Sequence, residues 1–410
     1  MSTAIVRPAV AFRMAPFFGF AGFGAFWGVW GAALPLLRAQ AGVSDAEFGV
    51  ALLLVGAGAL PAMLLAGRLV DAVGLRVAGI LLALLGVMGV VLAAGSVSYG
   101  ALCVGILLVG ASSGAADVAI NTLAATVEKR TGRPVVARSH ATFSATVAVS
   151  SLGAGALAAL ADSLLVTFAA AAIGVAAFGL AVVVSTHSAP AGGGAAPGSE
   201  GGVVSGSEGV SMRRGGRGSR WVALIVIGAI GALAFAAENA YQTWVAVLLT
   251  DAFAASPALA AVAPAAFATT AALTRLATAA ITMRRAIATL VVASLVATAG
   301  GVLTAFAPTL PLALAGIVAA AAGASVLFPT LLSYGLRPVA DESRGRATSA
   351  ISTVAYLGYL AGPAYFGLLA DATGVQPAFV GVAVLTAVLP VTIPALSIGR
   401  RSWLRASAPG

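Results

Sequence analysis

The chain has 410 residues, of which 60% are hydrophobic and 9% are charged, and its formal net charge is +9. Soluble domains carry about 25% charged residues, so this chain has too few charged groups to keep a globular surface in water. The composition excludes a soluble enzyme, a disulfide-stabilised secreted domain and a disordered protein, and it indicates a polytopic membrane protein. With 1 cysteine and 2 histidines, a metal site built from these residues is not expected.

Long apolar stretches separated by short polar breaks run through the whole chain. A membrane-crossing helix needs about 20 mostly apolar residues. In chain order the sequence predicts twelve such spans, at residues 15–37, 46–66, 76–94, 99–127, 139–160, 163–184, 221–249, 257–281, 286–306, 310–333, 347–369 and 377–398. The predicted fold class is therefore an all-α polytopic membrane protein.

Basic residues are distributed unevenly between the two sides of these spans. With both termini in the cytoplasm, every Lys and Arg except Arg38 and Arg275 falls on the inner side. The outer turns carry acids instead: Asp45, Asp162, Asp251 and Asp371. This asymmetry follows the positive-inside rule and predicts a multi-pass protein of the cytoplasmic (inner) membrane.

A Gly-, Ser- and Ala-rich segment at residues 186–220 interrupts the series of spans. We expect it to be a flexible cytoplasmic linker between two six-helix bundles, at residues 1–185 and 221–410. The bundles share weak internal similarity, since residues 138–144 and 346–352 open the fifth and eleventh spans with related sequences. This similarity predicts two pseudo-symmetric, duplicated units.

The turn between the second and third spans has the sequence Gly67-Arg-Leu-Val-Asp-Ala-Val-Gly-Leu-Arg76. It resembles the cytoplasmic signature of the major facilitator superfamily, which implies the twelve-helix major facilitator fold. The resemblance makes Gly67, Arg68, Asp71, Gly74 and Arg76 a cytoplasmic gating motif. We expect Asp71 to hold the two halves together on the cytoplasmic side when the cavity faces outward.

Three further stretches resemble the fucose-permease-like branch of this superfamily. They are Asp117-Val-Ala-Ile-Asn121 with the segment 139–144, Glu238 in the seventh span, and Gly358-Tyr-Leu-Ala-Gly-Pro363. The resemblance implies that the first, fourth, seventh and tenth helices line a central cavity. The first span has no acid, in contrast to the sugar/proton symporters of the branch.

Two acidic residues, Asp117 and Glu238, lie deep within predicted spans. A charge at the centre of a bilayer costs about 3 kcal/mol on insertion scales, so such a residue needs a partner or a function. We expect Glu238 to be the main proton carrier, because its helix carries no base and Arg275 should extend toward the cytoplasm. Asp117 and Asn121, one helical turn apart, are expected to form the opposite wall of the substrate site.

Other polar and aromatic residues on the cavity helices are candidates for contacts with the substrate. Amides next to a carboxylate can orient it or bind hydroxyl groups, and aromatic faces bind sugar rings or cations. The candidates are Asn121, Asn239, Gln242, Trp27, Trp30 and Tyr241. Helix packing and interhelical hydrogen bonds are the alternative roles for these side chains.

The sequence predicts a proton-coupled secondary transporter that moves a small organic solute by alternating access, with uptake by symport favoured. Efflux of an amphiphilic compound by proton antiport is one alternative, and a non-transporting membrane sensor or scaffold is another. Neither an ATP-binding loop nor an enzyme motif is present, so no enzyme activity, catalytic residue, cofactor, metal or nucleic-acid partner is expected. We expect a monomer in the lipid bilayer whose partners are its solute and protons.

Overall fold

The structure is a computed structural model, and it describes residues 10–187, 217–339 and 341–394. Most of the predicted linker, residues 188–216, lies outside the described residues. The first half of the chain forms six helices: α1 (Val10–Ala41), α2 (Asp45–Val73), α3 (Val77–Gly95), α4 (Tyr99–Thr131), α5 (Val135–Ala161) and α6 (Leu164–His187).

The second half forms another helical bundle. Its helices are α7 (Arg217–Phe253), α8 (Pro257–Ala260), α9 (Val262–Phe306), α10 (Leu310–Leu336), α11 (Asp341–Thr373) and α12 (Val375–Ala387). Helix α9 contains parts of two predicted spans, which are separated by the non-helical backbone of Arg285 at φ −128° and ψ 44°. The described residues contain 12 helical stretches long and apolar enough to cross a membrane, which confirms the predicted fold class.

Local sequence signals fix several helix ends. Ser44 caps α2, because its hydroxyl accepts a hydrogen bond from the Glu47 amide while the Glu47 carboxylate accepts one from the Ser44 amide. At the other end of α2, Gly74 adopts φ 90° and its amide donates to the Val70 carbonyl. A positive φ is inexpensive only for glycine, so Gly74 allows the sharp turn into α3 that the gating motif requires.

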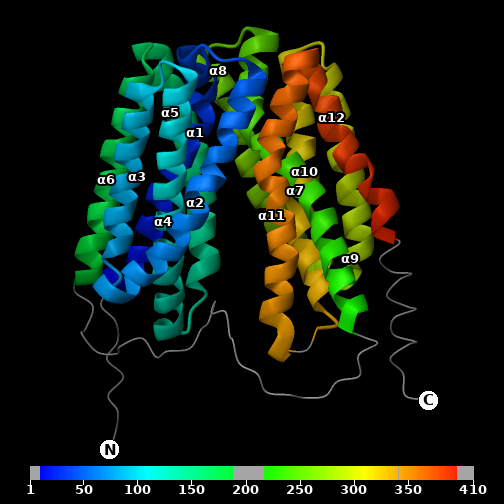
Figure 1. Cartoon of the computed structure of the whole chain (residues 1–410), viewed down its shortest axis with the longest axis horizontal. Coiled ribbons are helices and arrows are strands. Elements are labelled where there is room, and N and C mark those ends of the chain that lie inside the picture. The colour runs from blue at the N-terminus through cyan, green and yellow to red at the C-terminus, as the bar shows by residue number, and fades with distance from the viewer. Residues whose placement is uncertain (1–9, 188–216, 340, 395–410) are drawn as a thin grey trace, which may run out of the picture.

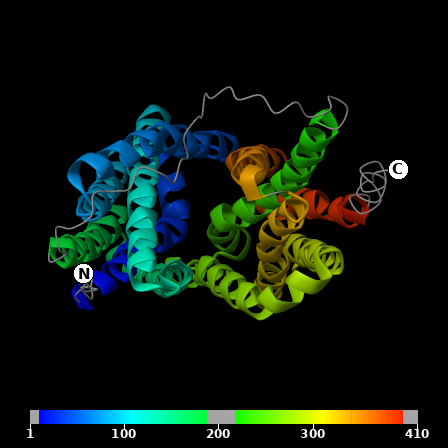
Figure 2. The ribbon, with the colours of Figure 1, turned by 90° about the horizontal axis from the view of Figure 1, so that it is seen from below.

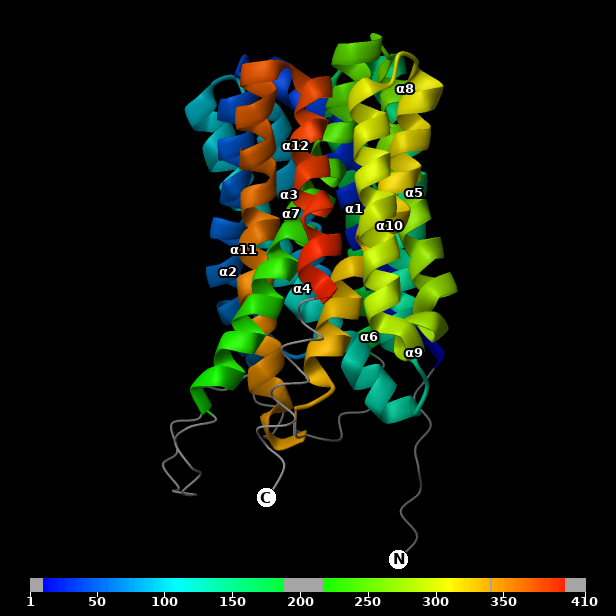
Figure 3. The same ribbon diagram turned by 90° about the vertical axis from the view of Figure 1, so that its right-hand side faces the viewer.

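The two bundles stand side by side (Figure 1). Val10, His187 and Arg217 all lie at one end of the molecule, which we call the terminal side; the other end is the opposite side. Viewed from the terminal side, the bundles form two separate groups of helices (Figure 2), and the helices run close to vertical in Figure 3. The bundles therefore join mainly at the opposite side.

The junction between the bundles consists of α2 with α11, α5 with α8 and α9, and α1 with α7. At Gly49 of α2, an added Cβ would lie 3.0 Å from the Cα of Gly367 in α11, so only glycine permits this backbone approach. In the second contact, the Ser151 hydroxyl of α5 donates to the Ala261 carbonyl over 3.1 Å. These contacts lie at the ends of the helices remote from the terminal side.

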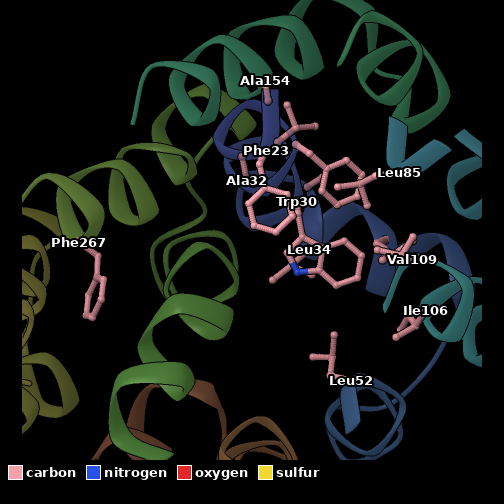
Figure 4. Close-up of a cluster of buried hydrophobic side chains, with 14 of the residues drawn as sticks. Phe23, Trp30, Ala32, Leu34, Leu52, Leu85, Ile106, Val109, Ala154 and Phe267 are labelled. Carbon is pink, nitrogen blue, oxygen red and sulfur yellow. The ribbon is translucent and has the colours of Figure 1, made fainter. Parts of the chain in front are cut away.

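Apolar packing follows the same division. The large buried cluster includes Phe23 and Leu34 of α1 together with Trp244, Phe267 and Phe366 of the second bundle, so it crosses the junction. Figure 4 shows its centre, where side chains of α1 are surrounded by those of neighbouring helices. A second cluster is confined to the terminal side of the C-terminal bundle: Ile227, Ile230, Leu290, Val326, Leu331, Ile351 and Ile393 are among its members. The bundles share one core at the opposite side and have separate cores at the terminal side.

An arginine at the end of α1 adds an ionic contact to this junction. The Arg38 guanidinium forms an ion pair with Asp45 of its own bundle. Its Nη2 also donates to the Asp251 carboxylate at the end of α7 over 2.5 Å. Arg38 thus links three helices and both halves of the chain. Arg38 was the one arginine that the sequence analysis assigned to an outer loop, next to acids, and it forms this half-buried ionic contact with them.

We predict that Arg38→Gln shifts the molecule toward a state in which the opposite side is open. The substitution leaves Asp45 and Asp251 close together without a cation, and a loss of about 1–2 kcal/mol changes a two-state ratio by roughly 5- to 30-fold. Double electron–electron resonance between labels at positions 163 and 309, in a Cys103→Ser background, measures the shift. Distances that are unchanged by Arg38→Gln would contradict the prediction.

Candidate functional site

Glu238 of α7 and Arg275 of α9 form an ion pair in the middle of the second bundle. Arg275 Nη2 lies 2.8 Å from Glu238 Oε1, and Arg275 Nε donates to the Ser325 carbonyl of α10 over 2.9 Å. The expectation that Glu238 lacks a base and that Arg275 extends away from it is therefore wrong. The Arg275 guanidinium donates to the Glu238 carboxylate and the Ser325 carbonyl, so it has hydrogen-bond partners without extending toward the cytoplasm. The side chain of Arg275 is 44% exposed.

The two carboxylate oxygens of Glu238 have unequal surroundings. Oε1 accepts hydrogen bonds from Arg275 and, over 3.1 Å, from the Gln242 amide one turn along α7. Oε2 has no hydrogen-bond partner among the described residues. Because the side chain is only 5% exposed, solvent does not replace that partner. Gln242 thus bonds Glu238 in this structure, and its contact with a substrate stays a prediction. A buried carboxylate oxygen without a donor is energetically costly while the group is charged. Protonation of Glu238 removes this cost.

Asp117 of α4 has a different environment. The Asn121 side-chain amide donates to Asp117 Oδ1 over 3.0 Å and to the Asp117 carbonyl over 2.9 Å, and the role of the pair in the substrate site stays a prediction. No basic side chain of the described residues lies within ion-pair distance of Asp117. The N-terminal bundle therefore contributes a partly buried carboxylate that has an amide partner and no cation.

An aromatic cluster joins three helices of the second bundle. Phe235 of α7 packs against Phe328 of α10, with ring centroids 4.0 Å apart, and against Tyr356 and Tyr359 of α11. Both tyrosines lie within electrostatic range of Asp117 and of Glu238. Sequence reasoning missed this cluster. The spacing of Tyr356 and Tyr359 on one face of α11 was the available signal.

The predicted aromatic contacts on α1 separate into two environments. Trp30 is 6% exposed and points into the core (Figure 4), where its ring stacks on Phe26. Trp27 is half-buried and makes an edge contact with Phe23, whose ring lies 5.7 Å from that of Phe143 in α5. Of the two tryptophans, Trp27 is the one available for contact with a solute.

Asn239 and Tyr241 lie within helix packing. The Asn239 amide donates to the Tyr359 carbonyl of α11 over 2.5 Å. Tyr241 is 1% exposed and packs between Phe267 and Phe379. Neither side chain is available for direct contact with a substrate in this conformation, because other helices of the bundle cover both. Spacing along one helix does not reveal which neighbour covers each face.

The described residues contain no cluster of three or more His, Cys, Asp or Glu side chains that could hold a metal ion. A groove of about 620 Å³ between α2, α3 and α4 is lined almost wholly by apolar side chains such as Leu65, Leu81 and Leu108. It lies within the N-terminal bundle and does not include Asp117. The polar groups able to act on a solute are therefore those between the two bundles.

Comparison with known proteins agrees with the fold. A family model described as Major Facilitator Superfamily matches residues 227–403. An uncharacterised transporter of Sinorhizobium fredii is 26% identical over 373 residues, covering 88% of this chain and 92% of the relative. An uncharacterised transporter of the same type from Yersinia pestis is 27% identical over 354 residues, covering 86% of this chain and 87% of the relative. The second half of the chain is thus similar to the Major Facilitator Superfamily, and the chain as a whole is similar to two uncharacterised transporters.

Solved structures of this type share the fold at low sequence identity. A bacterial homologue of the human lysosomal transporter Spinster, in an inward-facing and occupied conformation, aligns with a TM-score of 0.71, 15% identity and coverage of 94% of this chain and 96% of that one. The nucleoside transporter NupG aligns with a TM-score of 0.69, 14% identity and coverage of 94% and 98%. At this level of identity the likenesses show a shared fold.

The gating motif lies at the terminal side, where the bundles are apart. Asp71 and Arg68 are exposed, and a Cβ added at Gly67 would meet no atom within 4 Å. This placement fits a latch that engages only when the terminal side closes. The role of Asp71 stays a prediction.

For this motif we predict that Asp71→Asn increases the fraction of molecules open at the terminal side. Loss of the carboxylate removes a contact that only the state closed at that side can make. Double electron–electron resonance between labels on the α2–α3 turn and near Arg285 measures the fraction of molecules that are open at the terminal side. Unchanged distance distributions would remove Asp71 from the gating motif.

For the ion pair we predict that Arg275→Gln lowers thermal stability more than the double substitution Glu238→Gln with Arg275→Gln. The single substitution leaves a buried carboxylate without its cation, whereas the double substitution leaves neutral amides; coupling within such pairs is about 0.5–3 kcal/mol. Thermal unfolding of the purified protein compares the variants, with the exposed Arg138→Gln as control. Equal destabilisation by the single and double substitutions would show that the pair is not coupled.

Proposed function

We propose that this protein is a proton-coupled secondary transporter that moves a small organic solute by alternating access. The observation that carries the proposal is the Glu238 carboxylate, which is buried, has one oxygen without a partner and shares the other with Arg275. A proton on Glu238 removes the buried charge and weakens its hold on Arg275. Such a pair can exchange a proton as the surrounding bundle changes its exposure.

The arrangement of the bundles supports alternating access. They share a core at the opposite side and are apart at the terminal side, where we place the cytoplasm and both termini of an inner-membrane protein. Asp117 belongs to one of these bundles and the aromatic cluster to the other, so movement of the bundles changes their separation. The inward-facing conformation of the Spinster homologue has the same fold.

The direction of transport is part of the proposal. Uptake by symport accords with the resemblance to the fucose-permease-like branch, which we include in the proposal. Efflux by antiport is favoured by a different observation: the exposed Tyr356 and the half-buried Trp27 present aromatic rings, which suits an amphiphilic solute. A non-transporting sensor needs no exchangeable proton, so Glu238 argues against it.

We predict that Glu238→Gln retains counterflow exchange and loses accumulation driven by a pH gradient. Glutamine resembles the protonated acid in shape and charge, so the solute site and the conformational cycle persist while proton exchange does not. A thermal-shift screen identifies a solute, and proteoliposome uptake is then measured with and without an imposed gradient. The sign of the gradient that drives accumulation distinguishes symport from antiport.

Two further variants make this assay specific. Asp162→Asn, at a surface turn with φ 44°, removes a carboxylate outside the site and should leave accumulation unchanged. The double substitution Glu238→Gln with Arg275→Gln tests whether an unpaired guanidinium causes the loss. Accumulation by Glu238→Gln at the wild-type level would place proton coupling elsewhere, and ligand binding without any flux would favour the sensor.

A further inference from the structure

We propose that the solute is an organic cation, bound by Asp117 of α4 and the aromatic cluster Phe235, Phe328, Tyr356 and Tyr359 of the second bundle. This proposal rests on the proposed transport function and names the chemical class of its substrate. It is carried by three observations: the balance of charge around the two membrane acids, the exposure of the Tyr356 ring, and its common depth with Asp117.

The charges between the bundles do not balance. Glu238 is neutralised by Arg275, with 2.8 Å between their charged atoms. Asp117 has only the Asn121 amide, and the described residues supply no cation for it. A carboxylate inside a membrane protein is stabilised by a positive partner. A cationic solute provides that partner at the point where the protein provides none.

The aromatic cluster offers ring faces and a phenol opposite this carboxylate. Tyr356 is 53% exposed, and its ring lies 5.4 Å from that of Phe235 and 6.1 Å from that of Tyr359. Asp117 belongs to the first bundle and acts electrostatically on both tyrosines, which belong to the second. Aromatic faces attract cations and also bind apolar substituents. Asp117 on one side and the aromatic cluster on the other therefore suit an amine or quaternary ammonium group with an apolar part.

The two walls lie at the same depth. At 1.5 Å per residue, Asp117 is about 27 Å along α4 from Tyr99, and Tyr356 is about 26 Å along α11 from Thr373, both measured from the opposite side. Phe23 of α1 is also about 27 Å from the opposite end of its helix. A small cation at this level can contact the carboxylate and the rings together.

An anionic solute fits the charges less well. Its available partners are Arg275, which is already paired with Glu238, and His140, which lies within electrostatic range of Arg275 and contacts the ring of Phe20. Binding an anion there would place it near Asp117 and require the Glu238 pair to break. The charge balance therefore favours a cation over an anion.

The test compares probes of equal shape and opposite charge. Equilibrium dialysis of the detergent-purified full chain measures binding of tetraphenylphosphonium against tetraphenylborate, and of the smaller phenyltrimethylammonium against benzenesulfonate. We expect both cations to bind and both anions to bind weakly or not at all. Asp117→Asn should weaken cation binding roughly tenfold or more, because it removes a partly buried charge partner.

Matched variants separate charge, ring and folding effects. Tyr356→Leu should weaken cation binding several-fold, whereas Tyr356→Phe keeps the ring and should retain it. Asp162→Asn should bind cations as the wild type does, and thermal unfolding shows that each variant is folded. Cation binding that is unaffected by Asp117→Asn, preferential binding of the anions, or no cation binding would overturn the proposal. Proton-driven transport of a neutral or anionic solute would overturn it as well, while leaving the proposed function intact.

Discussion

The contact between the bundles at the opposite side determines how the rest of the molecule is arranged. There, Gly49 and Gly367 bring the backbones of α2 and α11 together, and residues of both halves share one apolar core. Without a hydrophobic effect between helices in lipid, such close backbone packing is the main source of helix association. Among the described residues the terminal side has no equivalent shared core, so the contact that closes one end leaves the bundles apart at the other.

This arrangement explains why the two acids have different environments. Glu238 lies within a single bundle, where α9 and α10 supply Arg275 and a carbonyl for it, so its charge is balanced whichever way the bundles move. Asp117 has a partner only from its own helix among the described residues. Its surroundings must change when the bundles move. A residue balanced within one bundle suits proton exchange, and a residue left open between bundles suits solute binding.

Much of the fold follows from the sequence, because apolar length, the positive-inside pattern and the capping residues Ser44 and Gly74 act over short distances. Contacts one turn apart, such as Asp117 with Asn121, are equally predictable from helix geometry. The pairing of Arg275 with Glu238 was not, since it depends on how two helices are rotated and at what depth they meet. The same limit applies to Tyr241, whose burial depends on Phe267 and Phe379 from other helices.

The break in α9 has a mechanical consequence. Its first segment meets α5 at the junction and carries Arg275, while its second segment packs along α10 and α12 in the body of the bundle. Within the described backbone of α9, the two segments differ from continuous helix at Arg285. Rotation about the dihedral angles of this one residue tilts the first segment, so Arg285 acts as a hinge. The second segment keeps its packing against α10 and α12. The N-terminal bundle uses a turn with Gly74 at the corresponding point, so the two halves have pivots of unequal stiffness.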